Sequence, residues 1–197
     1  MMAQWPRANR SSTGENPAMT TTDPTRHSRH SGQALAAGVL TGILALYIAL
    51  VAFGNITDFG TNQQFVRHVL AMDSTFKDHD LMWRAITSTA LQDTAYVLII
   101  AWETVAALVL IWGTYLWAAR RDEAFARRVS TYGLLMLLLL FGAGFIAIGG
   151  EWFAMWQAKA WNGEDSATRV FLLSGVALIV NHLPGGGRAA VEESPTS

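Results

Sequence analysis

The sequence of 197 residues contains no cysteine. This absence excludes disulfide bonds, thiol redox chemistry, cysteine-ligated iron–sulfur clusters and the common structural zinc sites. An excess of charge is also lacking: the formal net charge of −1 argues against a basic surface, so we expect no nucleic-acid partner. The metalloprotease motif HExxH, the hydrolase motif GxSxG and an intact nucleotide-binding glycine motif are missing too. No motif therefore indicates an enzyme.

The histidines are too widely separated to predict a haem or metal site. A transmembrane haem needs two axial ligands at matching depth, whereas His68 falls in a loop and His182 at the end of an apolar run. The acidic segment 73–80 could loosely hold a divalent cation, but such segments are usually only solvated. We therefore expect no metal and no cofactor.

Long apolar runs are what the sequence does contain, and there are four of them. Each approaches the roughly 20 residues that a helix needs to cross a ~30 Å hydrocarbon layer. They predict an all-α protein, a four-helix transmembrane bundle with spans at about 34–53, 94–117, 129–150 and 167–183. The fourth run is the shortest, with a clean apolar stretch of only 170–180. The polar segments 1–33 and 184–197 are predicted to be flexible cytoplasmic tails outside the membrane domain 34–183.

Basic residues are distributed unevenly between the two sides of these spans. The connection between the second and third spans carries Arg120, Arg121, Arg127 and Arg128. The long connection 55–93 carries more acidic than basic residues. Because Lys and Arg concentrate in cytoplasmic loops, this distribution places the connection 55–93 outside and both termini in the cytoplasm. The expected location is the plasma membrane, with several crossings.

The outer loop 55–93 has a pattern of its own. Over residues 63–72, apolar side chains recur on one helical face, which predicts a short amphipathic helix in the membrane interface. The members of this face are Phe65, Val66, Val69, Leu70 and Met72. A further helical turn is predicted within 81–91, with Trp83 and Ile86 facing inward. These elements could cap the outer end of the bundle, or form a docking surface or a substrate vestibule.

Small residues recur at four-residue spacing in the first run, at Ala34, Gly38 and Gly42. This spacing lets two membrane helices approach closely. The motif does not distinguish packing within the chain from packing between chains. Besides the lipid bilayer, a membrane-protein partner and a homo-oligomer therefore both remain open.

Glu103 is the most unusual polar residue in the runs. At 1.5 Å per residue it lies about 14 Å into the second span, close to the bilayer midplane. A charged side chain there costs roughly 2.5–3.5 kcal/mol, so Glu103 should face inward and be protonated or find a donor. Tyr47 and Ser174 lie at comparable depths and are the expected donors. Glu103 could handle a proton or cation, or it could fix the register of the helices.

Other candidate groups gather at the predicted outer boundary. Glu151 ends the third span and Arg169 begins the fourth at similar depth, which predicts an ion pair between them. Four tryptophans near this boundary are predicted to form an outer aromatic cluster: Trp83, Trp152, Trp156 and Trp161. Such a cluster is typical of the interfacial aromatic belt, although a ligand-binding box would give the same pattern.

Several short segments resemble, in order, those of a known family. They are 55–60 (NITDFG) with Asn62, 65–73 (FVRHVLAMD), 83–86 (WRAI), 151–157 (EWFAMWQ), 161–163 (WNG) and 167–169 (ATR). Over roughly 35–183 the chain resembles the domain-of-unknown-function 2165 family of bacterial predicted small integral membrane proteins. Thr168 departs from the aromatic residue expected there. The resemblance implies a four-helix protein of the bacterial inner membrane and no transferable activity. It makes Glu103 and the outer clusters, with His68, Asp73 and Arg84, the residues to test.

Three classes of function remain. An accessory or assembly subunit of a larger membrane complex fits a small bundle with a patterned outer surface, and it is the favoured hypothesis. A small transporter or ion-coupled protein would use Glu103. A membrane enzyme acting at the outer face would use Glu151, His68 and Asp73.

Overall fold

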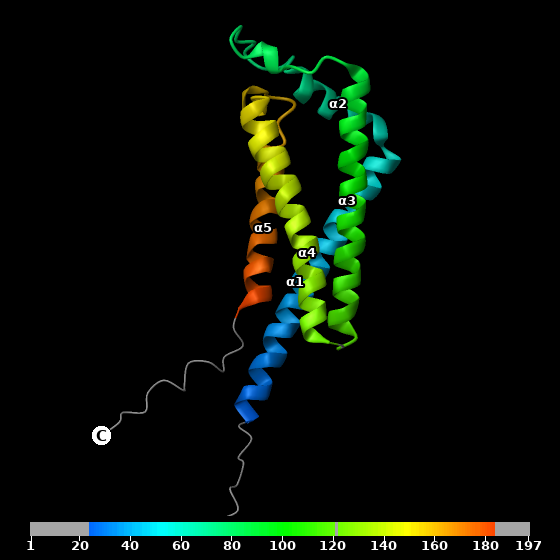
Figure 1. The fold of residues 1–197 in the computed structure, drawn as a ribbon, viewed down its shortest axis with the longest axis vertical. Helices are drawn as coiled ribbons and strands as arrows, with labels where there is room; N and C mark the ends of the chain where they lie inside the picture. The colour runs from blue at the N-terminus through cyan, green and yellow to red at the C-terminus, as the bar shows by residue number, and fades with distance from the viewer. Residues whose placement is uncertain (1–23, 121, 184–197) are drawn as a thin grey trace, which may run out of the picture.

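The computed structural model describes residues 24–120 and 122–183, which contain no strand and five α-helices (Figure 1). The helices are α1 (Pro24–Thr57), α2 (Phe59–Ala71), α3 (Thr89–Ala118), α4 (Glu123–Leu137) and α5 (Glu164–His182). A π-helix, η2 (Leu138–Trp152), continues α4, and two short 3-10 turns are η1 (Met82–Arg84) and η3 (Met155–Gln157). The all-helical prediction is confirmed for these residues.

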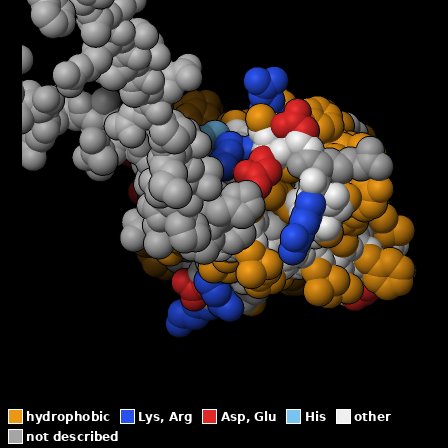
Figure 2. All heavy atoms as spheres, turned by 90° about the horizontal axis from the view of Figure 1, so that it is seen from below, with side chains coloured by type: hydrophobic (Ala, Val, Ile, Leu, Met, Phe, Trp, Pro, Cys, Tyr) orange, Lys and Arg blue, Asp and Glu red, His pale blue; other side chains and the backbone are white. Residues whose placement is uncertain are grey.

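The four longest helical segments run side by side along the long axis of the molecule (Figure 1). α1 packs along α3 and α5, and α4 likewise packs along α3 and α5. α2 and the connection to α3 lie at one end, which we call the outer end after the topology predicted from the sequence. The connection between α3 and α4 lies at the opposite, inner end, where charged side chains adjoin the hydrophobic flanks (Figure 2).

Three of the described helices are long and apolar enough to cross a membrane: Gly32–Thr57, Thr89–Ala118 and Glu123–Trp152. α5 is not among them, because Glu164, Asp165 and Arg169 occupy its first turns and shorten its apolar stretch. Of the four predicted spans, three are therefore confirmed as helices that could cross a membrane. The boundaries of the spans also differ from the prediction, since the second one, α3, begins at Thr89 rather than near 94. α1 begins at Pro24, inside the predicted tail 1–33; the rest of that tail and the tail 184–197 lie outside the described residues.

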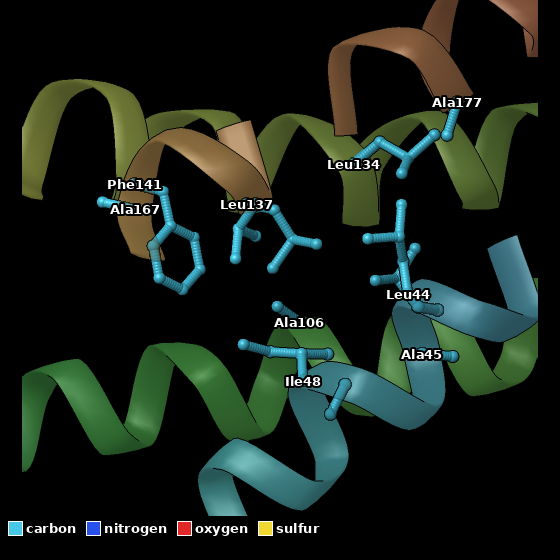
Figure 3. Packing of buried hydrophobic residues seen from close by; sticks show 12 residues of the cluster. Leu44, Ala45, Ile48, Ala106, Leu134, Leu137, Phe141, Ala167 and Ala177 are labelled. Carbon is cyan, nitrogen blue, oxygen red and sulfur yellow. The ribbon is translucent and has the colours of Figure 1, made fainter. Parts of the chain in front are cut away.

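The core is a layer of apolar side chains between α1, α3, α4, η2 and α5 (Figure 3). Its labelled members are Leu44, Ala45, Ile48, Ala106, Leu134, Leu137, Phe141, Ala167 and Ala177. The opposite helix faces are apolar as well: Leu46 and Leu108 are each more than 60% exposed. Apolar faces this extensive suit a lipid environment rather than water.

The small residues of α1 serve contacts within the chain. A Cβ atom added at Gly38 would lie 3.0 Å from Trp117 Cβ, and one added at Gly42 would lie 3.2 Å from Thr114 Cγ2. Both neighbours belong to α3, so the glycines allow α1 and α3 to pack closely. At these two positions the spacing reflects intramolecular packing.

Candidate functional site

A buried carboxyl, Glu103, lies between α3 and the last turn of α1. Glu103 is 2% exposed and Asn55 is 9% exposed. Asn55 Nδ2 donates a hydrogen bond of 2.6 Å to Glu103 Oε2, and the Tyr96 hydroxyl donates one of 3.1 Å to the carbonyl of Asn55. Glu103 therefore faces the interior, as the sequence predicts, and Asn55 is its donor.

The predicted donors were wrong. Tyr47 is 43% exposed on the outside of α1, and Ser174 is buried but its Oγ has no hydrogen-bond partner in the described part of the chain. The reason is helix register: α1 continues to Thr57, so its last turn, rather than Tyr47, lies level with Glu103.

Asn55 itself was missed because it follows the predicted end of the first span. The sequence did hold a signal for it, since Asn55 extends the buried helical face of α1 that includes Ile48 and Ala52. Glu103 lies near the middle of α3 but level with the outer end of α1. Its depth in the membrane therefore does not follow from its position along α3 alone.

An ion pair joins α2 to the start of α3. Arg67 Nε and Nη2 donate to the two carboxylate oxygens of Asp93, each at 2.8 Å, and Gln63 Nε2 donates to Asp93 Oδ1 at 2.9 Å. The hydrogen bonds that the Arg67 guanidinium donates to Asp93 raise the pKa of this guanidinium above its ordinary value. The predicted short helix is confirmed as α2, with Val66 buried and Val69 and Leu70 packed against the cluster of Met72, Phe153 and Ala154. The sequence did not predict Asp93 as the partner, because the pairing depends on how α2 folds back onto α3.

His68, in the last turn of α2, meets Asp73, which follows the helix. His68 Nδ1 lies 2.8 Å from Asp73 Oδ2, and the Trp161 ring stacks on the imidazole with centroids 4.4 Å apart. Glu151 is exposed and has no hydrogen bond or ion pair with either of them in the described residues. The three residues considered for an enzyme at the outer face therefore do not form one constellation.

The predicted ion pair between Glu151 and Arg169 is not formed. Arg169 is exposed, and its Nε instead donates to the carbonyl of Asp165, 3.2 Å away in its own helix. The start of α5 explains this, because a Cβ atom added at Gly150 would meet the carboxylate of Glu164. Glu164 therefore lies level with the end of η2, and Arg169 lies more than a helical turn further along.

The outer tryptophans form separate pairs rather than one cluster. Trp83 meets Trp152 edge to face at 5.5 Å, Trp156 meets Phe76 at 6.0 Å, and Trp161 stacks on His68. Trp83 was predicted to face inward but is 71% exposed. η1 is a single 3-10 turn followed by extended backbone, so helical spacing does not apply there.

An apolar cavity of about 160 Å³ lies between α2, α3 and η2. Its walls include Phe65, Val69, Ile99, Phe145, Ile148 and Phe153. Nowhere in residues 24–120 and 122–183 do three metal-ligating side chains of His, Asp or Glu come together. The cavity chemistry suits an apolar group rather than an ion.

The family model described as "Predicted small integral membrane protein (DUF2165)" matches residues 33–184. The match includes the three candidate spans and α5. No curated protein and no solved structure matches the chain.

Proposed function

The chain belongs to the DUF2165 family of predicted small integral membrane proteins, and within that frame we propose that it is an accessory or assembly subunit of a larger membrane complex. The proposal includes four crossings of the bacterial inner membrane, with α5 as the fourth and both termini in the cytoplasm. The contacts at the inner end support this topology. Gln33 Nε2 donates to the carbonyl of Leu183, and Asn181 Nδ2 donates to the carbonyl of Arg127 at 3.0 Å. The start of α1 and the end of α5 therefore lie at the same end of the molecule.

The observation that carries the proposed role is an outer cap joined by hydrogen bonds and packing contacts, with exposed aromatic side chains. We define the outer cap as α2, residues 72–88 and residues 153–163. Phe76 is 74% exposed and Trp156 is 51% exposed, and they contact each other. The backbone beneath them is held in place, since Phe76 N–H donates to Gln157 Oε1 at 2.9 Å. Preorganised aromatic side chains are characteristic of protein interfaces.

The buried residues around the cap favour a structural role as well. Met72 is 1% exposed and packs with Phe153 and Ala154, and the Ile86 N–H donates to the carbonyl of Leu70 at 2.8 Å. These contacts connect the loop before α3 to the segment after η2. The cap can therefore present a fixed surface to a partner without rearranging.

Site-specific photocrosslinking tests this role. A photoreactive amino acid at Phe76 should give a discrete adduct with one partner protein, and a stoichiometric complex should survive mild-detergent purification. The matched control is the same probe at Phe53, which is 64% exposed on the apolar flank of α1. A chain that purifies only as itself or as a homo-oligomer, with no adduct at Phe76, would refute the proposal.

A second candidate, an ion-coupled protein, is supported by one observation. Glu103 is buried, and its carboxyl has a single hydrogen-bond partner among the described residues, Asn55. Below it the core is apolar, with Leu110, Leu134 and Leu137 fully buried. A carboxyl group at the outer end of an apolar core suits local proton exchange better than proton transfer along a continuous polar path through the bundle.

A further inference from the structure

The guanidinium of Arg84 packs against two tryptophan rings at the outer end of the molecule. We call Arg84, Trp83 and Trp152 the aromatic clamp. Its guanidinium carbon lies 4.7 Å from the centre of the Trp152 ring and 5.7 Å from that of Trp83. Trp83 belongs to η1, and Trp152 is the last residue of η2. Two segments far apart in the sequence therefore meet at one guanidinium, which packs against both indole rings, and the rings contact each other edge to face at 5.5 Å.

Most of the hydrogen-bonding capacity of this guanidinium is unused. Within the part of the chain that the structure describes, Arg84 Nε is buried without a hydrogen-bond partner, and Nη1 donates only a long bond of 3.4 Å to the carbonyl of Trp152. No carboxylate of the described residues lies within ion-pair distance of Arg84, whereas Arg67 is paired with Asp93. Because Nε itself is buried, an anion from outside the chain can reach only the terminal nitrogens, of which Nη2 has no hydrogen bond within the described residues and is not among the buried unpartnered atoms.

The guanidinium fork and its position both favour phosphate. Arginine binds phosphate oxygens through parallel N–H donors, and tryptophan side chains concentrate where lipid headgroups lie. The apolar cavity lies in the same region. Val69 and Leu70 line it, and they also pack in one hydrophobic cluster with Met82 and Ala85. Met82 and Ala85 are the sequence neighbours of Trp83 and Arg84. Phe153, next to Trp152, also lines the cavity. The lining of the apolar cavity is therefore connected to the aromatic clamp through neighbouring residues.

We infer that Arg84, held by Trp83 and Trp152, binds the phosphate of an anionic phospholipid whose acyl chain lies in the adjacent apolar cavity. The tryptophans orient the guanidinium, the guanidinium selects the phosphate, and the cavity favours a lipid over a free phosphate ion. This assignment is independent of the partner proposed above, which would contact Phe76 and Trp156.

Native mass spectrometry of the full chain in non-ionic detergent tests the assignment with added phosphatidylglycerol. The wild type should retain one lipid, and Arg84→Gln should weaken its retention about tenfold, the loss expected when one charge-assisted hydrogen-bonded contact is removed. Lys159→Gln is the matched control, because Lys159 is an exposed cation on the same cap. Arg84→Lys, which keeps the charge but loses the fork, should fall between the two.

The alternatives give distinct results. Equal retention by the wild type, Arg84→Gln and Lys159→Gln would overturn the site. Displacement of the lipid by an equal concentration of inorganic phosphate would overturn the lipid assignment in favour of a free anion. Circular dichroism and thermal melting establish that each variant is folded; if Arg84→Gln unfolds, the comparison of Arg84→Lys with the wild type decides.

Discussion

Glu103 and Asn55 show how one polar contact can be tolerated in an apolar bundle. The Asn55 amide satisfies one carboxyl oxygen, and Tyr96 in turn satisfies the carbonyl of Asn55. One oxygen of the Glu103 carboxyl and both the side-chain nitrogen and the carbonyl of Asn55 therefore have partners, which lowers the cost of burying these groups. The arrangement links α1 and α3 at a point where both are buried.

We expect Glu103→Gln to leave stability nearly unchanged, because the glutamine carbonyl can still accept from Asn55 Nδ2. Glu103→Leu should destabilise the protein by about 1–3 kcal/mol, since it strands the buried amide of Asn55. Unfolding in detergent measures both. A leucine variant as stable as the wild type would show that the hydrogen bond has no structural role.

The same glutamine variant separates the two candidate functions. If Glu103 only supports the fold, the variant should retain the stoichiometric partner complex and all transport-related readouts. If Glu103 exchanges a proton, a proton-flux assay in vesicles should lose its signal although the protein remains folded. Infrared spectra at pH 7 identify the state of the carboxyl, through a protonated carbonyl band that disappears in Glu103→Gln.

At the scale of elements, close helix contacts at glycine determine how α3 and α4 pack. A Cβ atom added at Gly113 would lie 2.8 Å from Ser130 Oγ and 3.3 Å from the Ser130 backbone nitrogen. Ser130 Oγ also accepts a hydrogen bond of 2.9 Å from Trp117 Nε1. The backbone of α4 cannot move away cheaply, so this contact needs a residue without a side chain.

Gly113→Ala should therefore destabilise the protein by about 1–3 kcal/mol through overpacking and disturbance of the hydrogen bond between Trp117 and Ser130. Thermal unfolding followed by circular dichroism provides the measurement. Gly175→Ala is the matched control, because no atom lies within 4 Å of a Cβ added there, and it should cost nothing. Equal melting temperatures for the two variants would contradict the close packing of α3 on α4.

At the scale of the whole molecule, the absence of cysteine makes topology directly testable. Single cysteines can replace His79 in the outer loop, Glu123 at the inner end of α4, and Leu183 after α5. All three positions are exposed. A membrane-impermeant thiol reagent applied to intact cells should label His79→Cys, whereas Glu123→Cys and Leu183→Cys should react only after permeabilisation. Labelling of Leu183→Cys in intact cells would overturn the crossing by α5.

Some of these features follow from the sequence by itself, because they depend on short-range properties. The length of an apolar run and its helical period predict a membrane helix or an amphipathic one without reference to the rest of the chain. The three long spans and the buried face of α2 were predicted in this way. Burial of Glu103 was also predictable, because the cost of exposing a carboxyl to lipid applies wherever the helix packs.

Only the tertiary structure decided which residues meet. Asn55 and Glu103 are 48 residues apart in the sequence, and Arg67 and Asp93 are 26 apart. Their pairing depends on the register of whole helices. A shift of about two turns of α1 replaced Tyr47 by Asn55, and a shift of more than one turn of α5 separated Glu151 from Arg169. That register is determined by many side-chain contacts at once, such as Gly38 against Trp117, so no local pattern contains it.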